Sequence, residues 1–182
     1  MKLDQYNNSW YRPGNIFIRI LWYFMNLIFI RNQWIPFSVI KRIILRIFGA
    51  KIGKGVIIKP SVNIKYPWKL EIGNHVWIGE GVWIDNLGKV QIKDHVCISQ
   101  GAYLLTGNHN YKKLQFDLIV KDIVIENGVW IGAKAIVCPG VKCNTNSILT
   151  AGSVAVENLD NDAIYQGNPA VEIRKRLIEN EG

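Results

Sequence analysis

The chain has 182 residues, of which 49% are hydrophobic and 20% charged, a length and composition that suit one folded domain with a small appendage and exclude a disordered chain. The net charge of +8 is concentrated in residues 1–60, which contain ten Lys or Arg and one acid, whereas residues 61–182 contain twelve Lys or Arg and thirteen acids. No recognised nucleic-acid-binding motif accompanies the basic segment, so no nucleic-acid partner is expected.

The first 50 residues are predicted to form an apolar and basic helical segment. The run 16–30 is strongly apolar, but Arg19 and Asn26 interrupt it, and it is shorter than the roughly 20 residues needed to span a bilayer. No small-residue cleavage site follows, so no secretory signal is expected. A second helix is expected to begin at Pro36-Phe37-Ser38, because apolar residues then recur at helical spacing with basic residues between them. The apolar positions are Ile40, Ile43, Ile44, Ile47 and Phe48, and the basic ones are Lys41, Arg42 and Arg46.

A six-residue repeat dominates residues 51–156. An aliphatic residue opens most units, and a small or β-branched residue usually follows four positions later. Three such hexapeptides predict one triangular coil, in which each hexapeptide forms one flat side and its opening aliphatic residue points inward. Ordinary alternating strands have a period of two and no reason to keep a step of six. Clear units are IGKGVI (52–57), IGNHVW (72–77), IGEGVW (78–83), IKDHVC (92–97), ISQGAY (98–103), IENGVW (125–130) and IGAKAI (131–136).

The repeat therefore predicts an all-β fold, a left-handed parallel β-helix of about five triangular coils. Ile52, Ile72 and Ile92 are 20 residues apart, so each early coil has two residues beyond three hexapeptides, and we place these extra pairs at the corners Leu70-Glu71 and Val90-Gln91. Left-handed winding is an exception to the usual crossover hand. A C-terminal turn and tail is expected to follow over residues 157–182.

Four features together resemble the hexapeptide-repeat acyltransferase superfamily over residues 50–176: the repeats, a loop with TGNH, the unit GVWIGAKA, and a closing AGSV…QGNPA. The N-terminal LDQYNNSWYRPG, a hydrophobic segment and then FGAKIGKGV resemble one subgroup, the acetyltransferases of colanic-acid-type exopolysaccharide synthesis. The resemblance implies a homotrimer that binds acetyl-CoA as acyl donor in the groove between neighbouring prisms.

The repeat breaks between Leu104 and Ile125, where the loop 106–118 cannot wind onto a coil. Insertions into a solenoid often form its binding face. The loop contains His109, and acetyl transfer to a hydroxyl needs a base that titrates near neutral pH, as a free imidazole does at about 6.5. The family's catalytic histidine lies in a matching TG(x)H setting, so the resemblance makes His109 the candidate general base.

The remaining site residues are candidates for donor and acceptor binding. The resemblance implies that the cofactor-binding positions are Trp130, Ala133, Ala151, Gly152 and Arg174, with Lys175 and Arg176 as further basic residues near the coenzyme phosphates. On the acceptor side of His109, Asp85 and Asn86 interrupt a coil corner, and together with Asn108 they are candidates for holding a sugar.

No metal site is expected. His75 and His95 occupy the same position in successive coils, which favours a structural or solvent-facing stack at about 4.8 Å over a ligand pair. A catalytic zinc ion needs three protein ligands, and the histidine spacings do not supply them. The three cysteines lack disulfide or metal-site spacing, which is typical of a reduced, cytoplasmic protein.

The function we expect is transfer of an acetyl group from acetyl-CoA to a sugar hydroxyl, in capsule, exopolysaccharide or O-antigen biosynthesis. No serine or cysteine is placed beside His109 as a nucleophile, so direct transfer is favoured over an acyl-enzyme. Two classes of alternative remain. One is an enzyme of the same fold that acetylates an amine on a nucleotide-linked amino sugar, or a xenobiotic. The other is a non-catalytic β-helix scaffold. A scaffold has no need of a loop histidine.

Two compatible roles are open for the N-terminal segment. It can cap the first coil, whose edge otherwise exposes strand backbone. Residues 14–48 can also contact the inner face of a membrane, since a basic amphipathic helix suits such an interface and a lipid-linked sugar acceptor. Because His109 and the donor groove lie far along the chain, we expect residues 1–35 to be dispensable for acetylation of a soluble acceptor.

Overall fold

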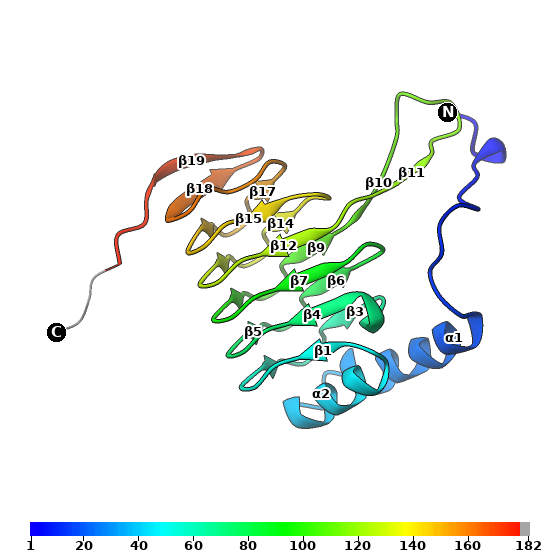
Figure 1. Ribbon diagram of the computed structural model, residues 1–182, viewed down its shortest axis with the longest axis horizontal. Helices are drawn as coiled ribbons and strands as arrows, with labels where there is room; N and C mark the ends of the chain where they lie inside the picture. Colours follow the sequence, from blue (N-terminus) through cyan, green and yellow to red (C-terminus); the bar gives the residue numbers. More distant parts are fainter. Residues whose placement is uncertain (179–182) are drawn as a thin grey trace.

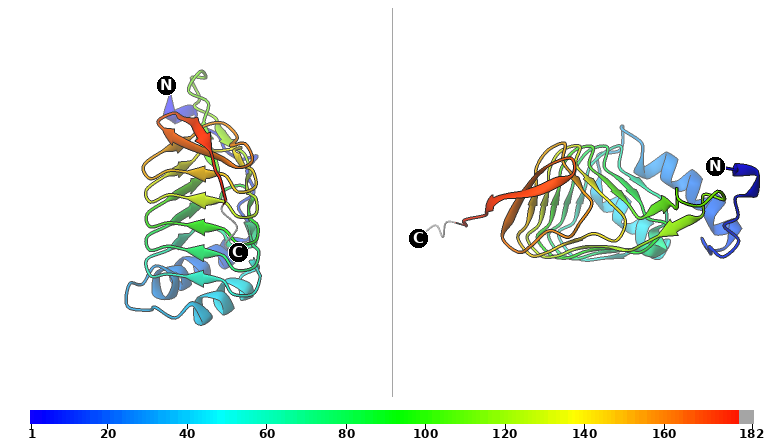
Figure 2. Two further views of the ribbon diagram at one scale, coloured as in Figure 1. Left: turned by 90° about the vertical axis from the view of Figure 1, so that its left-hand side faces the viewer. Right: turned by 90° about the horizontal axis from the view of Figure 1, so that it is seen from above.

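The computed structural model describes residues 1–178 as a triangular prism of stacked coils, with helices at its first coil, a hairpin projecting from one edge and a second hairpin at its last coil (Figures 1 and 2). The prism has five complete coils and a partial sixth, slightly more than the predicted five. Each of its three faces is a parallel sheet that takes one strand from every complete coil.

The faces are named here in the order in which the chain visits them. Face A contains β1 (Lys51–Ile52), β4 (Leu70–Ile72), β7 (Val90–Ile92), β12 (Ile123–Ile125) and β15 (Lys142–Cys143). Face B contains β2 (Ile57–Ile58), β5 (Trp77–Ile78), β8 (Cys97–Ile98), β13 (Trp130–Ile131), β16 (Ile148–Leu149) and β18 (Ala163–Gly167). Face C contains β3 (Asn63–Ile64), β6 (Trp83–Asp85), β9 (Tyr103–Leu105), β14 (Ile136–Val137) and β17 (Val154–Ala155).

The aliphatic residues that open the hexapeptides stack inside the prism. Ile52 pairs with Ile72 and Ile72 with Ile92, as the 20-residue spacing predicts. Left-handed backbone forms the corner between faces A and B, where His75 and His95 have φ of +54° and +59° and their rings stack 5.2 Å apart. Both rings are exposed, so the structural interpretation of these two histidines holds.

All insertions into the coils lie at one corner, between faces C and A. They are the 3-10 helix η3 (Pro67–Lys69), the loop 86–89, and an antiparallel hairpin of β10 (Gly107–His109) and β11 (Leu118–Val120). Leu70-Glu71 and Val90-Gln91 are paired strand residues of face A, so the predicted position of the extra residues was a few positions too late. The predicted loop 106–118 is this hairpin.

The helices α1 (Ile16–Met25) and α2 (Ser38–Ile47), joined through the π-helical turn η2 (Asn26–Ile30), cap the first coil. Their side chains hydrogen-bond the free backbone edge of that coil. Trp22 Nε1 donates to the Ile64 carbonyl (3.0 Å), Lys41 Nζ to that of Lys59 (2.8 Å), and Arg46 to those of Ile52 and Gly53, while Ser38 Oγ accepts from the Ile58 amide. Lys41 was predicted on a polar stripe but is fully buried, because its ammonium completes this edge.

The outer face of the cap is apolar and exposed, and within residues 1–178 no helix is long and apolar enough to cross a membrane. Its exposed large apolar residues are Ile16, Phe17, Ile18, Ile20, Leu21, Tyr23, Phe24, Leu27, Ile28, Trp34, Phe37, Val39, Ile40, Ile43 and Ile47.

The C-terminal part extends the prism beyond residue 156, where the sequence analysis ended it. Strand β18 adds to face B, and β19 (Ala170–Lys175) pairs with it in an antiparallel hairpin that covers the last coil (Figure 2).

Residues 1–15, which we call the strap, run along the C/A corner from the β10–β11 hairpin to α1 and include the 3-10 helix η1 (Leu3–Gln5) (Figure 1). The Lys2 amide donates to the Leu114 carbonyl at 2.7 Å, and Trp68 Nε1 donates to the Pro13 carbonyl at 3.2 Å. The start of the chain therefore lies at the His109 hairpin, contrary to the expectation that it is remote from it.

Candidate active site

The β10–β11 hairpin is anchored to the coil below it through Thr106. This buried hydroxyl donates to the Asp85 carbonyl at 3.0 Å and accepts from the Gly88 amide at 2.8 Å. Both partners belong to the preceding turn of the same corner, so the hairpin that carries His109 rises from a rigid base.

One hydrogen bond fixes the protonation pattern of His109. Its Nδ1 lies 2.9 Å from the carbonyl oxygen of Phe116. A carbonyl can only accept, so Nδ1 carries the proton and Nε2 of the neutral ring keeps its lone pair. Phe116 has a left-handed backbone (φ +55°), and its ring stacks on the imidazole at 4.3 Å. The arrangement orients the imidazole as a proton acceptor.

A hollow of about 300 Å³ adjoins His109 at the C/A corner. The strap supplies part of its wall, with the Tyr6 ring 5.7 Å from the imidazole. Other lining residues are Tyr11, Arg19, Lys65, Tyr66 and Leu87. Sequence reasoning missed the strap residues, although the LDQYNNSWYRPG motif was the signal that could have found them.

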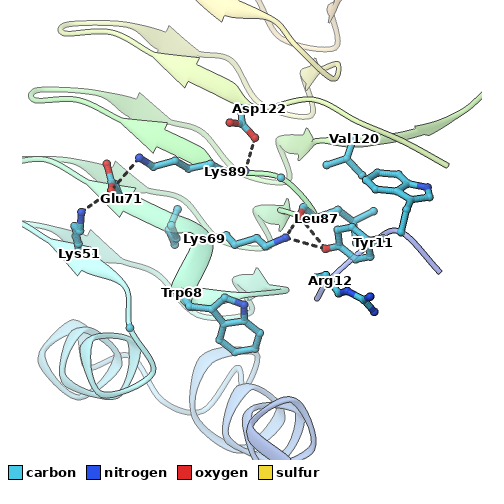
Figure 3. Close-up of a pocket in the computed structure, with 14 residues that line it drawn as sticks. Tyr11, Arg12, Lys51, Trp68, Lys69, Glu71, Leu87, Lys89, Val120 and Asp122 are labelled. Atoms are coloured by element: carbon cyan, nitrogen blue, oxygen red, sulfur yellow. Dashed lines mark hydrogen bonds and ion pairs between the residues drawn. The ribbon is translucent and has the colours of Figure 1, made fainter. Parts of the chain in front are cut away.

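Tyr11 fixes the strap against the corner (Figure 3). Its hydroxyl donates to the Leu87 carbonyl at 2.8 Å, and Lys69 Nζ donates both to that carbonyl and to the Tyr11 oxygen. Burial raises the pKa of the Tyr11 hydroxyl above its usual value and lowers that of the Lys69 ammonium. These contacts hold the strap beside His109.

The hollow drawn in Figure 3, about 470 Å³, lies on the other side of Tyr11, and three of its charged groups, Lys51, Glu71 and Lys89, bind one another. Glu71 pairs with Lys51 at 2.9 Å and Lys89 at 3.1 Å, and it accepts a hydrogen bond from Gln91. The hydrogen bonds from Lys51, Gln91 and Lys89 lower the pKa of Glu71 to about 2. Glu71, Lys51, Lys89 and Gln91 are therefore engaged with one another and form a structural network.

The three predicted acceptor residues have different surroundings. Asn86 is fully buried, and its amide bonds the backbone N–H and carbonyl of Tyr66, so it cannot contact a sugar and the prediction is corrected. Asp85 pairs with Lys65 at 2.8 Å and accepts from the Tyr103 hydroxyl, which positions Lys65 beside the hollow. Asn108 is exposed, but strand alternation directs its side chain away from that of His109.

The predicted cofactor residues gather in a separate groove of about 270 Å³ at the corner between faces B and C. Trp130, Ala133 and Ala151 line it, and Trp130 Nε1 donates to Ser99 Oγ at 2.9 Å. Gly152 follows directly, with a left-handed backbone (φ +71°) and no atom near the position of a Cβ. Small residues leave this corner open to an extended ligand.

Arg174 lies in the same outward row of face B as Trp130, since Trp130 pairs with Ile148, Ile148 with Ile164 and Ile164 with Arg174. Three strand spacings of about 4.8 Å separate the two residues. Lys175 pairs with Glu172 and Arg176 donates to the carbonyls of Gly128 and Asn146, whereas Arg174 makes no side-chain hydrogen bond or ion pair within residues 1–178. Of the three basic residues, Arg174 is the one free for a phosphate.

His109 and the donor groove therefore lie on different edges of one prism. His109 follows face C at the C/A corner, and the groove lies at the B/C corner. Within residues 1–178, no group of three or more His, Cys, Asp or Glu could hold a metal ion.

Comparison with known proteins identifies the family, although no family model matches the chain. WcaF of Escherichia coli (strain K12), named for an acetyltransferase of colanic acid biosynthesis, is 39% identical over 171 residues, 92% of each chain. The galactoside O-acetyltransferase of the same organism is 29% identical over 148 residues, which are 79% of this chain and 73% of that enzyme.

Among solved structures, a hexapeptide-repeat acetyltransferase of Vibrio cholerae O1 biovar eltor, complexed with acetyl-CoA, superposes with a TM-score of 0.79 at 23% identity over 88% of each chain. It confirms the predicted left-handed β-helix, and its acetyl-CoA agrees with the donor predicted from the sequence. The identity to WcaF over almost the whole chain shows that this protein belongs to the hexapeptide-repeat acetyltransferases and is, as predicted, an acetyltransferase.

Proposed function

We propose that this protein transfers the acetyl group of acetyl-CoA to a hydroxyl of a sugar in capsule, exopolysaccharide or O-antigen biosynthesis. The observation that carries the proposal is the hydrogen bond from His109 Nδ1 to the Phe116 carbonyl, which leaves the Nε2 lone pair free beside a hollow. The names of its relatives, for colanic acid biosynthesis and for galactoside O-acetylation, support a sugar acceptor.

In this mechanism Nε2 of His109 takes the proton of the acceptor hydroxyl while the hydroxyl oxygen attacks the thioester carbonyl. The C–S bond then breaks, and the imidazolium returns the proton to the departing thiolate of coenzyme A. An acyl-enzyme is disfavoured because burial raises the pKa of the thiols of Cys97, Cys138 and Cys143, the last to about 12.

The separation of the two half-sites supports a homotrimer. The donor groove with Trp130, Ala133, Ala151, Gly152 and Arg174 and the His109 hairpin occupy different edges of one prism. When prisms pack side by side, one copy can present His109 to the groove of its neighbour. The exposed apolar cap supports a location at the cytoplasmic face of a membrane.

The test is release of free coenzyme A thiol from acetyl-CoA, measured with a soluble galactoside, an amino sugar and no acceptor. We expect thiol release with the galactoside and a turnover about 10²–10⁴-fold lower in His109→Ala. His95→Ala is the matched control, since His95 is an exposed corner residue. Near-normal turnover in His109→Ala contradicts the assignment, and faster transfer to the amine favours the N-acetyltransferase.

A further inference from the structure

A groove of about 380 Å³ separates helix α1 and turn η2 from face C. We call it the cap–prism groove. Its polar lining residues include Arg19, Asn26, Arg31 and Lys65, and its aromatic ones include Tyr23 and Trp83.

The cap–prism groove is cationic. No acidic residue lines it, and Arg19 and Arg31 make no ion pair or side-chain hydrogen bond within residues 1–178. Lys65 alone has an acidic partner, Asp85. Asn26 is 8% exposed, donates to Asn63 Oδ1 at 2.8 Å, and leaves its own Oδ1 without a partner within the described chain. Arg31 is exposed and Arg19 half-buried, so both guanidinium groups are free to bind an anion. Asn26 Oδ1 can accept only from a donor, such as a hydroxyl group of a ligand.

The groove connects two surfaces of different chemistry. At one end Arg19, Lys65 and Tyr66 also line the His109 hollow, so the two spaces adjoin each other along face C. Its other end is formed by Asn26 and Arg31 at turn η2, which carries Leu27 and Ile28 of the exposed apolar face of the cap. Apolar surface, free cations and the general base thus follow one another.

We propose that the cap–prism groove binds the phosphate of a lipid-linked sugar, whose lipid lies in a membrane against the outer face of the cap and whose sugar reaches His109. This inference rests on the proposed function and names its acceptor class. Guanidinium groups bind phosphate oxygens in a bidentate manner. A lipid is favoured over a nucleoside because the apolar outer face of the cap adjoins the groove, and because residues 1–60 contain one acid against ten basic residues, which suits an anionic membrane.

The experiment measures binding of the full-length protein to phosphatidylcholine vesicles that carry either polyprenyl diphosphate or phosphatidylglycerol at equal surface charge. We expect preference for polyprenyl diphosphate, and a loss of affinity for it of about tenfold in Arg19→Gln and in Arg31→Gln, the effect of one lost charged hydrogen bond. Arg31→Lys should recover part of the affinity. Arg42→Gln is the matched control, because it removes the same charge from the cap outside the groove.

Equal losses in Arg42→Gln and Arg31→Gln, or equal binding to both kinds of vesicle, overturn the proposal, since binding is then a general effect of charge. Displacement of the vesicles by uridine diphosphate that Arg31→Gln abolishes also overturns it, in favour of a soluble nucleotide-linked acceptor. Thermal unfolding of each variant checks its fold. No acetyl transfer enters the measurement, so its result is independent of the thiol-release assay that tests the proposed function.

Discussion

The two ends of the prism are closed in different ways. At the first coil, side chains of helices satisfy the free strand edge, through Trp22, Ser38, Lys41 and Arg46. At the last coil, backbone does so, because β19 pairs along β18. A helical cap leaves a second, outward surface that a paired strand does not.

The proposed chemistry divides in the same way. The first end, with its cap and strap, adjoins the His109 hollow and the cap–prism groove, which we assign to the acceptor. The donor groove runs over the last coils toward Arg174. The middle coils carry the His109 hairpin and Trp130 on their outside and a packed interior. Changes in that interior should therefore affect stability, and changes at each end should affect one substrate.

The largest expected effect on stability comes from the middle of the stack. Ile98 is fully buried between Ile78 and Ile131, and Ile98→Ala should lower the free energy of unfolding by about 2–5 kcal/mol through lost burial and a cavity. Ile47→Ala on the outer face of the cap, where the side chain is 74% exposed, is the control and should change it by less than about 0.5 kcal/mol. Urea unfolding at one protein concentration compares them, and equal losses would refute the division.

The coil stack was predictable because a step of six constrains every position, and the register of Ile52, Ile72 and Ile92 agrees with it. The break in the repeat between Leu104 and Ile125 also indicated the insertion that forms the hairpin. The buried states of Lys41 and Asn86 were not predictable, since each depends on a backbone group far away in the sequence, at Lys59 and Tyr66. Local polarity alone placed both residues at a surface.

The next effect concerns the helical end and depends on pH. Burial lowers the pKa of Lys41 from 10.5 to about 8. Between these values Lys41 binds more protons in the unfolded chain than in the folded one, so its contribution to the free energy of unfolding should rise with pH across that window, by up to about 3 kcal/mol. The raised pKa values of Cys97, Cys138 and Cys143 act in the opposite direction, so the contribution of Lys41 is the difference between the unaltered protein and Lys41→Met. Lys41→Met should remove this rise, and Lys54→Met, at an exposed lysine, should retain it. Unfolding at pH 7.5 to 10.5, about the window of the shift, measures it; a rise that persists in Lys41→Met shows another group to be responsible.

The strap should matter more for turnover than for stability, which reverses the expectation that residues 1–35 are dispensable. Deleting residues 1–12 removes Tyr6 and Tyr11 but keeps the Pro13 carbonyl that Trp68 binds. Turnover on a soluble galactoside should fall about ten- to a hundredfold, as expected when a reacting group loses its positioning. Tyr111→Ala, at an 80% exposed residue of the same hairpin, should have normal turnover. An unaltered rate in the deletion variant would make the strap a structural element only.

The smallest effect is expected at the strand-closed end, and it should concern the donor alone. Arg174→Ala should raise the KM for acetyl-CoA about tenfold, or about 1.4 kcal/mol, with little change in kcat, because a phosphate contact is remote from the reacting carbonyl and binds ground and transition states equally. Lys175→Ala is the matched control, since Lys175 is engaged with Glu172.

Acetyl-3′-dephospho-CoA sharpens the test of Arg174. If Arg174 binds the 3′-phosphate, the variant and the unaltered enzyme should have equal KM values for this analogue, because the group that Arg174 recognises is absent. A tenfold difference that persists with the analogue would assign Arg174 to the pyrophosphate, and a change in kcat instead of KM would move Arg174 from the donor phosphates toward the reacting centre.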